Sequence, residues 1–155
     1  MRISEILKQN KPTLSLEVFP PKTNADYETV RNVVIKISSL LPDFISVTYG
    51  AGGGTSLYTA QLASEVQQVY QVPALAHLFC VTSTKDMVKE QIDKIENMNI
   101  ENILALRGDL IDGMDTKNLD YHHASDLIFE VKKNHDFCIG GACYLEGHPE
   151  ANSLE

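Results

Sequence analysis

Short runs rich in β-branched and aromatic residues alternate along the chain with longer segments of helical periodicity. The short runs lie at 13–19, 44–49, 74–79, 102–106 and 137–144. Their length and composition are typical of buried β-strands. The intervening segments carry apolar residues at helical spacing, and the first such stripe consists of Val30, Val34, Ile37 and Leu41. This alternation predicts an α/β fold in which helices pack outside a parallel sheet.

The alternation is compatible with an open doubly wound sheet and with a (β/α)8 barrel. A doubly wound, dinucleotide-binding sheet has glycines in its first strand-to-helix turn, whereas residues 19–24 read Phe-Pro-Pro-Lys-Thr-Asn. That turn argues against the doubly wound sheet. Length is a difficulty for the barrel, because five units in 155 residues take about 31 residues each and a whole barrel needs roughly 250. Residues 1–155 contain no linker-like tract, so we expect a single domain.

Composition narrows the possible functions. The 13 Lys and Arg residues against 21 Asp and Glu residues give a net charge of −8, which disfavours nucleic acid as a partner because phosphates attract a basic face. No stretch approaches the roughly 18 apolar residues of a membrane span, and the first residues lack the apolar core of a signal peptide. We therefore expect a cytoplasmic protein without a membrane partner. Its three cysteines, Cys80, Cys138 and Cys143, are too few and too scattered for a disulfide framework.

Polar residues that are unusual in a core gather at or just after the ends of the predicted strands. They are Glu17, Thr48, Tyr49, His77, Arg107, Asp109, Tyr144, Glu146 and His148. Because the carboxyl ends of parallel strands are where α/β folds build their sites, these side chains are expected to converge on one rim. Glu17 interrupts an otherwise apolar run. Apolar surroundings raise the pKa of a carboxyl group and suit it to general acid catalysis.

Each of these residues also has a purely structural interpretation. Glu17 can be an outward-facing or ion-paired strand carboxylate, and His77 can be a core histidine with satisfied hydrogen bonds. The Arg-Gly-Asp sequence at 107–109 can be a turn held by a local ion pair. Taken singly, His77 and the turn favour these structural interpretations, and only their common location at strand ends indicates a site.

Two further features indicate ligand binding only weakly. The glycine-rich residues 50–55 precede a helix, where a phosphate can bind, but they lack the lysine of a P-loop. His122, His123 and His148 are not accompanied by the second half of a zinc-binding pattern, so no metal is expected.

Several motifs in a fixed order resemble those of the methylenetetrahydrofolate reductase family. They are Leu-Glu-Val-Phe-Pro-Pro-Lys-Thr at 16–23, Ser-Val-Thr-Tyr-Gly-Ala at 46–51, Ala-His-Leu at 76–78, Leu-Ala-Leu-Arg-Gly-Asp at 104–109, Ala-Ser-Asp-Leu at 124–127 and Tyr-Leu-Glu-Gly-His-Pro-Glu-Ala at 144–151. The resemblance runs from about residue 14 to the last residue. Because six motifs keep their order and spacing, it is far more specific than any one of them.

The resemblance implies a (β/α)8 barrel that holds FAD at the carboxyl ends of its strands. In this family NAD(P)H reduces the flavin, which then passes a hydride to 5,10-methylenetetrahydrofolate and yields 5-methyltetrahydrofolate. The cofactor carries the hydride chemistry, and the protein supplies placement and proton control. The implied partners are therefore a nicotinamide and a folate.

The resemblance also implies roles for particular residues. Glu17 matches the family's general acid, which protonates a folate nitrogen so that the methylene bridge opens to an iminium. Asp109 matches a carboxylate that stabilises the cationic intermediate and tunes the flavin. Thr48 also faces the nicotinamide. The positions that match flavin contacts are Thr48, Tyr49, Ala51, His77, Arg107, Gly108, Asp109, Ala124, Tyr144, His148 and Ala151.

The chain departs from the family pattern in three places. His123 stands where Tyr is frequent, which puts its contact with the flavin in question. Ser56 stands where Arg is common, which puts a charge after the glycine-rich residues in question. The chain also stops soon after its fifth predicted strand. We therefore expect an N-terminal, partial barrel with about five of eight strands, poorly active alone, whose unpaired strand edges favour a homo-oligomer.

Two other functions remain open at this stage. One is a non-catalytic half-barrel that serves assembly or partial flavin binding. The other is a barrel enzyme without a cofactor that uses Glu17 and His77 as acid and base.

Overall fold

The computed structural model describes residues 1–49, 56–110, 113 and 116–148. These residues form one parallel sheet whose strands are β1 (Ser15–Val18), β2 (Phe44–Val47), β3 (Ala74–Phe79), β4 (Asn102–Leu106) and β5 (Cys138–Gly141). The helices between successive strands are α2 (Tyr27–Ser38), α3 (Ser56–Gln68), α4 (Lys85–Asn97) and α5 (Ala124–Asn134). A short helix α1 (Ile3–Leu7) precedes the sheet, and a 3₁₀ turn η1 (Asn24–Asp26) leads into α2. None of the described helices is long and apolar enough to cross a bilayer.

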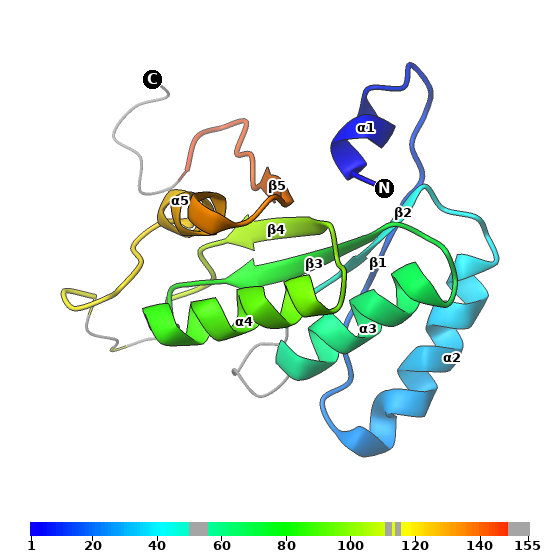
Figure 1. Ribbon diagram of the computed structural model, residues 1–155, viewed down its shortest axis with the longest axis horizontal. Coiled ribbons are helices and arrows are strands. Elements are labelled where there is room, and N and C mark those ends of the chain that lie inside the picture. Colours follow the sequence, from blue (N-terminus) through cyan, green and yellow to red (C-terminus); the bar gives the residue numbers. More distant parts are fainter. Residues whose placement is uncertain (50–55, 111–112, 114–115, 149–155) are drawn as a thin grey trace.

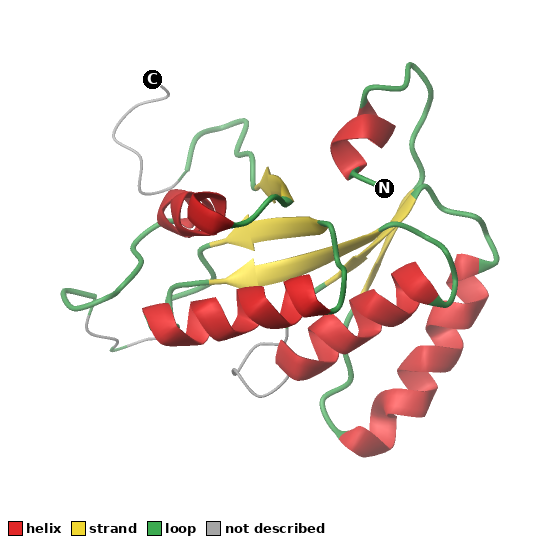
Figure 2. Cartoon of the chain, in the orientation of Figure 1, coloured by secondary structure: helices red, strands yellow, loops and turns green. Residues whose placement is uncertain are grey.

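The spatial order of the strands is the order of the sequence, β1-β2-β3-β4-β5, and every neighbouring pair is parallel. A doubly wound sheet reverses its strand order at a switch point, whereas a (β/α)8 barrel does not. Figure 1 shows α2, α3 and α4 following one another along one side of the sheet, and Figure 2 shows the regular alternation of strand and helix. The predicted α/β fold of the partial (β/α)8-barrel type is confirmed.

The two faces of the sheet differ in composition because successive strand residues point to opposite sides. One face packs under the helices and supplies the core residues Val18, Ile45, Val47, Ala74, Ala76, Leu78, Ile103 and Ala105. Leu62 and Val66 of α3 and Leu127 and Val131 of α5 are fully buried in the same core. Dry apolar contact on this face is the main source of stability for the sheet.

The opposite face, which we call the inner face, carries the polar strand residues. Strand register places Glu17 beside Ser46, and His77 beside Leu104. Leu75, Phe79, Leu104 and Leu106 lie on this face and are only half-buried. The inner face corresponds to the interior of a barrel, and in the described chain it is covered less than the helix-packed face.

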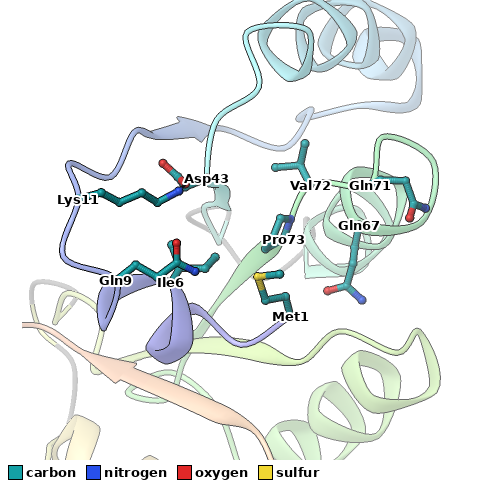
Figure 3. Close-up of a pocket in the computed structure, with 9 residues that line it drawn as sticks. All are labelled: Met1, Ile6, Gln9, Lys11, Asp43, Gln67, Gln71, Val72 and Pro73. Carbon is teal, nitrogen blue, oxygen red and sulfur yellow. Dashed lines mark hydrogen bonds and ion pairs between the residues drawn. The ribbon is translucent and has the colours of Figure 1, made fainter.

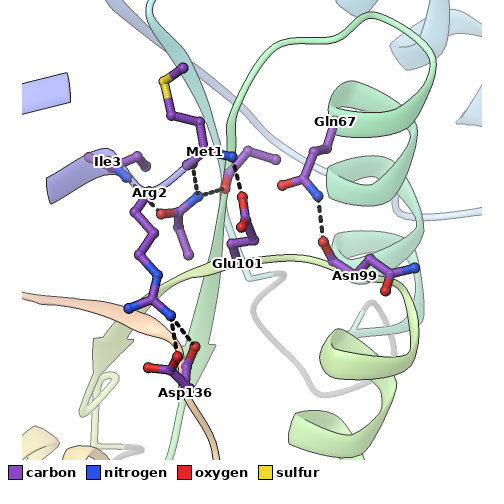
Figure 4. Close-up of polar contacts among 9 residues, drawn as sticks. Met1, Arg2, Ile3, Gln67, Asn99, Glu101 and Asp136 are labelled. Atoms are coloured by element: carbon purple, nitrogen blue, oxygen red, sulfur yellow. Dashed lines mark hydrogen bonds and ion pairs between the residues drawn. The ribbon is translucent and has the colours of Figure 1, made fainter. Parts of the chain in front are cut away.

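Helix α1 lies at the amino-terminal end of the sheet, beside a pocket whose lining includes Ile6 of α1 and Pro73 just before β3 (Figure 3). Figure 4 shows polar contacts of the residues that begin the chain. The fully buried Asn102 accepts a hydrogen bond from the Ile3 backbone N–H (2.8 Å) and donates one to the Ala74 carbonyl (3.0 Å). Arg2 donates to the Asp136 carboxylate at 2.6 Å. Because five residues are too few to show a helical period, α1 has no signal in the sequence and depends on these contacts.

All five predicted strands are present, but β1 and β2 are shorter than the predicted ranges 13–19 and 44–49. Two further boundaries differ for clear reasons. The first apolar stripe extends to Leu41, yet α2 ends at Ser38 and Leu41 is 85 % exposed with a φ of 54°. The last predicted strand, 137–144, ends at Gly141, because its pairing with β4 stops where Ala105 lies opposite Gly141. Cys143 therefore lies beyond the strand and is exposed.

Candidate active site

Three polar side chains meet on the inner face. The Ser46 hydroxyl oxygen lies 2.7 Å from Nε2 of His77 and 3.2 Å from a carboxylate oxygen of Glu17. The same carboxylate oxygen lies 3.6 Å from His77 Nε2. Ser46 and His77 are each 7 % exposed, whereas the Glu17 side chain is 51 % exposed. The cluster thus has two buried side chains, Ser46 and His77, and one carboxyl group that reaches into the open interior.

The electrostatics of His77 follow from its burial. Loss of solvent lowers the pKa of the imidazole, and the nearby charge of Glu17 opposes this only in part. The ring is therefore neutral at pH 7. A neutral imidazole can donate or accept at Nε2, depending on its tautomer.

A cavity of about 530 Å³ lies at the carboxyl ends of β3, β4 and β5. Its lining includes six of the positions expected to contact a flavin, namely Arg107, Gly108, Asp109, Ala124, Tyr144 and His148. Phe79 and Leu106 form the apolar wall contributed by the strands. A cavity of this size with apolar walls and a few polar groups is typical of a site for an organic ligand.

The turn after β4 brings its backbone close to the cavity. Gly108 has a φ of +86°, which L side chains rarely adopt, and a Cβ there would lie 3.3 Å from Val81 Cγ1. The Arg107 carbonyl accepts hydrogen bonds from the backbone N–H groups of Cys80 (3.3 Å) and Val81 (2.8 Å). The turn is thereby tied to the end of β3, and Asp109 is exposed at the cavity beside it.

The start of α5 forms another wall of the cavity. The Asp126 carboxylate accepts hydrogen bonds from the backbone N–H groups of His122 and His123, each at 2.9 Å. These bonds hold the pKa of Asp126 below its usual range. They satisfy donors that a helix start leaves open and position Ala124 and His123 at the cavity.

The residues after β2 and β5 complete the rim. The Tyr49 ring packs against Phe79 with centroids 5.2 Å apart. Beyond β5, Tyr144 and His148 meet edge to face at 5.0 Å, across a turn in which the Gly147 N–H donates to the Tyr144 carbonyl. The segment after β5 thus presents two aromatic side chains to the cavity.

The structure brings eight of the predicted residues together in two groups rather than one, while Thr48 and Tyr49 follow β2 and belong to neither group. Glu17 and His77 lie in the inner-face cluster, and the six residues named above line the cavity. Phe79 links the groups, because it lies two residues beyond His77 on the same face of β3. Ala51 and Ala151, together with the glycine-rich residues 50–55, lie outside the described residues.

Sequence reasoning missed several residues of the site. Ser46 lies between Glu17 and His77 but carries no signal except its place within a matching motif. Phe79, Leu106 and Ile128 line the cavity, and as apolar residues at strand and helix positions they look like ordinary core. Burial raises the pKa of the Cys80 thiol to about 11, so the thiol is protonated at neutral pH.

The residues present fit a bound flavin in two respects. Thr48, directly after β2, has a buried hydroxyl oxygen with no hydrogen-bond partner among the described residues. An unpaired buried hydroxyl is costly, so a ligand atom at this point would be stabilising. Gly108 supplies the second respect, because it lines the cavity and its positive φ and close approach to Val81 and Phe79 favour a residue without a side chain there.

The fold and the location of the site place the chain among (β/α)8-barrel proteins that build their site at the carboxyl ends of the strands. Within that class the chain belongs to the methylenetetrahydrofolate reductase family, whose model matches residues 2–155. The match begins well before residue 14, so it includes α1.

Curated relatives agree with this assignment. The chain is 37 % identical over 147 residues to a 5,10-methylenetetrahydrofolate reductase of Escherichia coli, covering 95 % of this chain and 49 % of the relative. It is 35 % identical over 147 residues to methylenetetrahydrofolate reductase 2 of Schizosaccharomyces pombe, covering 91 % of this chain and 23 % of the relative. It is 32 % identical over 154 residues to methylenetetrahydrofolate reductase (NADH) 1 of Arabidopsis thaliana, covering 96 % and 26 %. The chain therefore spans about half the length of the bacterial relative and about a quarter of the other two.

Proposed function

We propose that the chain is the flavin-binding and acid-catalytic part of a reductase that converts 5,10-methylenetetrahydrofolate to 5-methyltetrahydrofolate with NAD(P)H. The observation that carries the proposal is the cavity at the carboxyl ends of β3, β4 and β5, whose lining includes six of the positions expected for flavin contact. Membership of the family and the names of the relatives support the same reaction.

In this proposal FAD is held by the residues that line the cavity. Arg107, Gly108 and Asp109 approach it from the turn after β4, Ala124 from the start of α5, and Tyr144 and His148 from beyond β5. Bound flavin would supply hydride transfer between the nicotinamide and the folate. The hydroxyl of Thr48 adds a polar contact that the described chain leaves unused.

Glu17 is the proposed general acid. Its half-exposed carboxyl gives a proton to a folate nitrogen, the bond from that nitrogen to the bridging methylene carbon breaks, and the carboxylate remains. The iminium left on the other nitrogen carries the positive charge. The exposed carboxylate of Asp109 stabilises that charge.

Flavin titration tests the proposal directly. Adding FAD to the wild-type chain should produce a shifted flavin spectrum and quenched flavin fluorescence. Asp109→Ala should weaken this binding, whereas Asp86→Ala, at an exposed position in the first turn of α4, should leave it unchanged. A wild-type chain that leaves the flavin signal unchanged would contradict the proposal.

A second candidate function is a half-barrel that binds flavin or assembles without catalysis. The observation that favours it is the half-buried inner face, together with β1 and β5, which each pair with one neighbour in the described sheet. Flavin binding without oxidation of NADH or NADPH would favour this candidate over the reductase. We also predict that the chain self-associates and that it is cytoplasmic.

A further inference from the structure

The inner-face cluster has a feature that the proposed reaction does not use. Ser46 lies between the general acid and the histidine and contacts both of them, at 3.2 Å and 2.7 Å. Strand register explains this position, because Ser46 is the lateral partner of Glu17 and lies diagonally next to His77. Glu17 and His77 approach each other less closely, at 3.6 Å, so the hydroxyl is the closest link between them.

The geometry excludes a hydrolytic Ser-His-Glu triad. In such a triad the serine binds one ring nitrogen of the histidine and the carboxylate binds the other. Here the Ser46 hydroxyl and the Glu17 carboxylate both lie nearest to Nε2 of His77. Ser46 is also 7 % exposed, which leaves little access for attack on a substrate. The hydroxyl must therefore have another role.

The hydrogen-bond donors and acceptors of the three side chains indicate that role. A serine hydroxyl has one proton to donate and two lone pairs that accept. When Glu17 is ionised, the hydroxyl donates to the carboxylate and accepts from Nε2–H of His77. When Glu17 is protonated, the carboxyl O–H donates to the hydroxyl, which then donates to an unprotonated Nε2. Both arrangements are fully paired, and they differ only in hydrogen-bond direction and in the tautomer of His77.

We infer that Ser46 is a positioning residue for Glu17, whose hydroxyl holds the carboxyl group before and after proton donation by reversing its hydrogen bond against His77. This role rests on the proposed function of Glu17 as a general acid. The burial gradient suits it, because two buried groups anchor the base of the cluster while the carboxyl reaches the open interior. The acid then keeps its place as its charge changes.

The surroundings of His77 suit such a switch. Glu17 on β1 is the charged group that faces it, Ser46 on β2 is polar, and its register partner on β4 is Leu104. Because burial lowers the pKa of His77 below its ordinary value of 6.5, the ring is neutral above that pH. Its tautomer is then free to follow the hydroxyl.

The experiment follows the His77 tautomer by ¹⁵N NMR of the ring nitrogens at pH 8, in the 155-residue chain labelled at histidine. Glu17→Gln places a neutral N–H donor where the protonated carboxyl O–H would be. It should shift His77 from the Nε2–H toward the Nδ1–H tautomer in the wild-type background. In the Ser46→Ala background the same substitution should produce no shift, whereas in Ser46→Thr, which keeps a hydroxyl, the shift should return.

Ser38→Ala is the matched control, because Ser38 is also 7 % exposed and its hydroxyl lacks a partner among the described residues, but it lies on α2. It should leave the tautomer response intact. The inference would be overturned if Glu17→Gln shifted the His77 tautomer equally in the Ser46→Ala background. It would also be overturned if Glu17→Gln as a single substitution caused no shift. Flavin titration of the wild-type chain separates the two claims: a wild-type chain that binds no FAD rejects the proposed function without altering the tautomer result.

Discussion

Gly108 is the residue at which backbone conformation and packing act together. Its φ of +86° belongs to the left-handed region, and a Cβ would meet Val81 Cγ1 at 3.3 Å and Phe79 Cδ2 at 3.4 Å. Gly113 has a similar φ of +81°, but no atom of the described residues lies within 4 Å of a Cβ built there. Substitutions at these two glycines therefore distinguish the cost of the backbone conformation, which both share, from the cost of close packing, which applies at Gly108.

We expect Gly113→Ala to lower the free energy of unfolding by roughly 1–2 kcal/mol, the cost of left-handed backbone for an L residue. Gly108→Ala should lower it further and should also weaken flavin binding, because its methyl group crowds Val81 and contacts Phe79, which lines the cavity. Urea denaturation measures the first effect and flavin titration the second. Equal losses in the two variants would show that the packing around Gly108 tolerates a methyl group.

His77 makes the stability of the chain depend on pH. Burial lowers its pKa in the folded state, so the unfolded chain binds a proton at a higher pH than the folded chain does. The stability is fully present above about pH 6.5 and falls as the pH drops toward the folded-state pKa, by at most about 1.4 kcal/mol per pH unit for one group. Urea denaturation from pH 8 to pH 5 measures the loss.

His77→Gln is the informative variant, because glutamine keeps a polar side chain but does not titrate. It should flatten the pH dependence above pH 5, where the carboxylates Asp43 and Asp126, whose pKa values are also lowered, still remain ionised. A pH dependence as steep as that of wild type would assign the effect to other groups.

At the scale of the element, the start of α5 depends on one carboxylate. Asp126 accepts two backbone N–H groups, at His122 and His123, and the same turn borders the cavity. Asp126→Ala should lower the free energy of unfolding by about 1 kcal/mol, as loss of a helix N-terminal cap does. It should also weaken flavin binding, because Ala124 and His123 are no longer held in place.

Asp86→Ala is the control, because Asp86 also lies in the first turn of a helix, but there the capping bond is made by Thr84, which accepts from the Met87 N–H at 3.3 Å. It should cost only the loss of a favourable charge near the helix start, a few tenths of a kcal/mol. Equal costs for both aspartates, measured by urea denaturation, would mean that charge rather than hydrogen bonding matters at α5.

The elements differ in how far the sequence predicts them. Strands β3 and β4 match their predicted ranges fully, because both are buried within the sheet and read as continuous apolar runs. Helix α1 had no signal, since Asn102 and Asp136, about 100 and 134 residues away, hold it by hydrogen bonds. The strand-end residues were predictable as a set, because parallel strands end at one rim. Their division into a cavity and an inner-face cluster was not, since it depends on strand register.

At the scale of the whole molecule, the inner face is the surface best suited to self-association. It has half-buried apolar residues, including Leu104 and Leu106, on a sheet whose outer strands each pair once among the described residues. Such faces and edges favour pairing with another chain. We therefore predict that the chain self-associates through this face and that sedimentation velocity shows a mass rising with concentration.

A charged residue on the inner face tests where the contact lies. Leu104→Lys should shift the chain toward the monomer, because a lysine there would have to be buried in the interface without a partner. Phe129→Lys is the control, since Phe129 is 68 % exposed on α5, away from the inner face, and a new charge there remains in solvent. If Phe129→Lys dissociates the assembly and Leu104→Lys does not, the contact lies on the helical side. The open interior would then be free to take the folate that Glu17 is proposed to protonate.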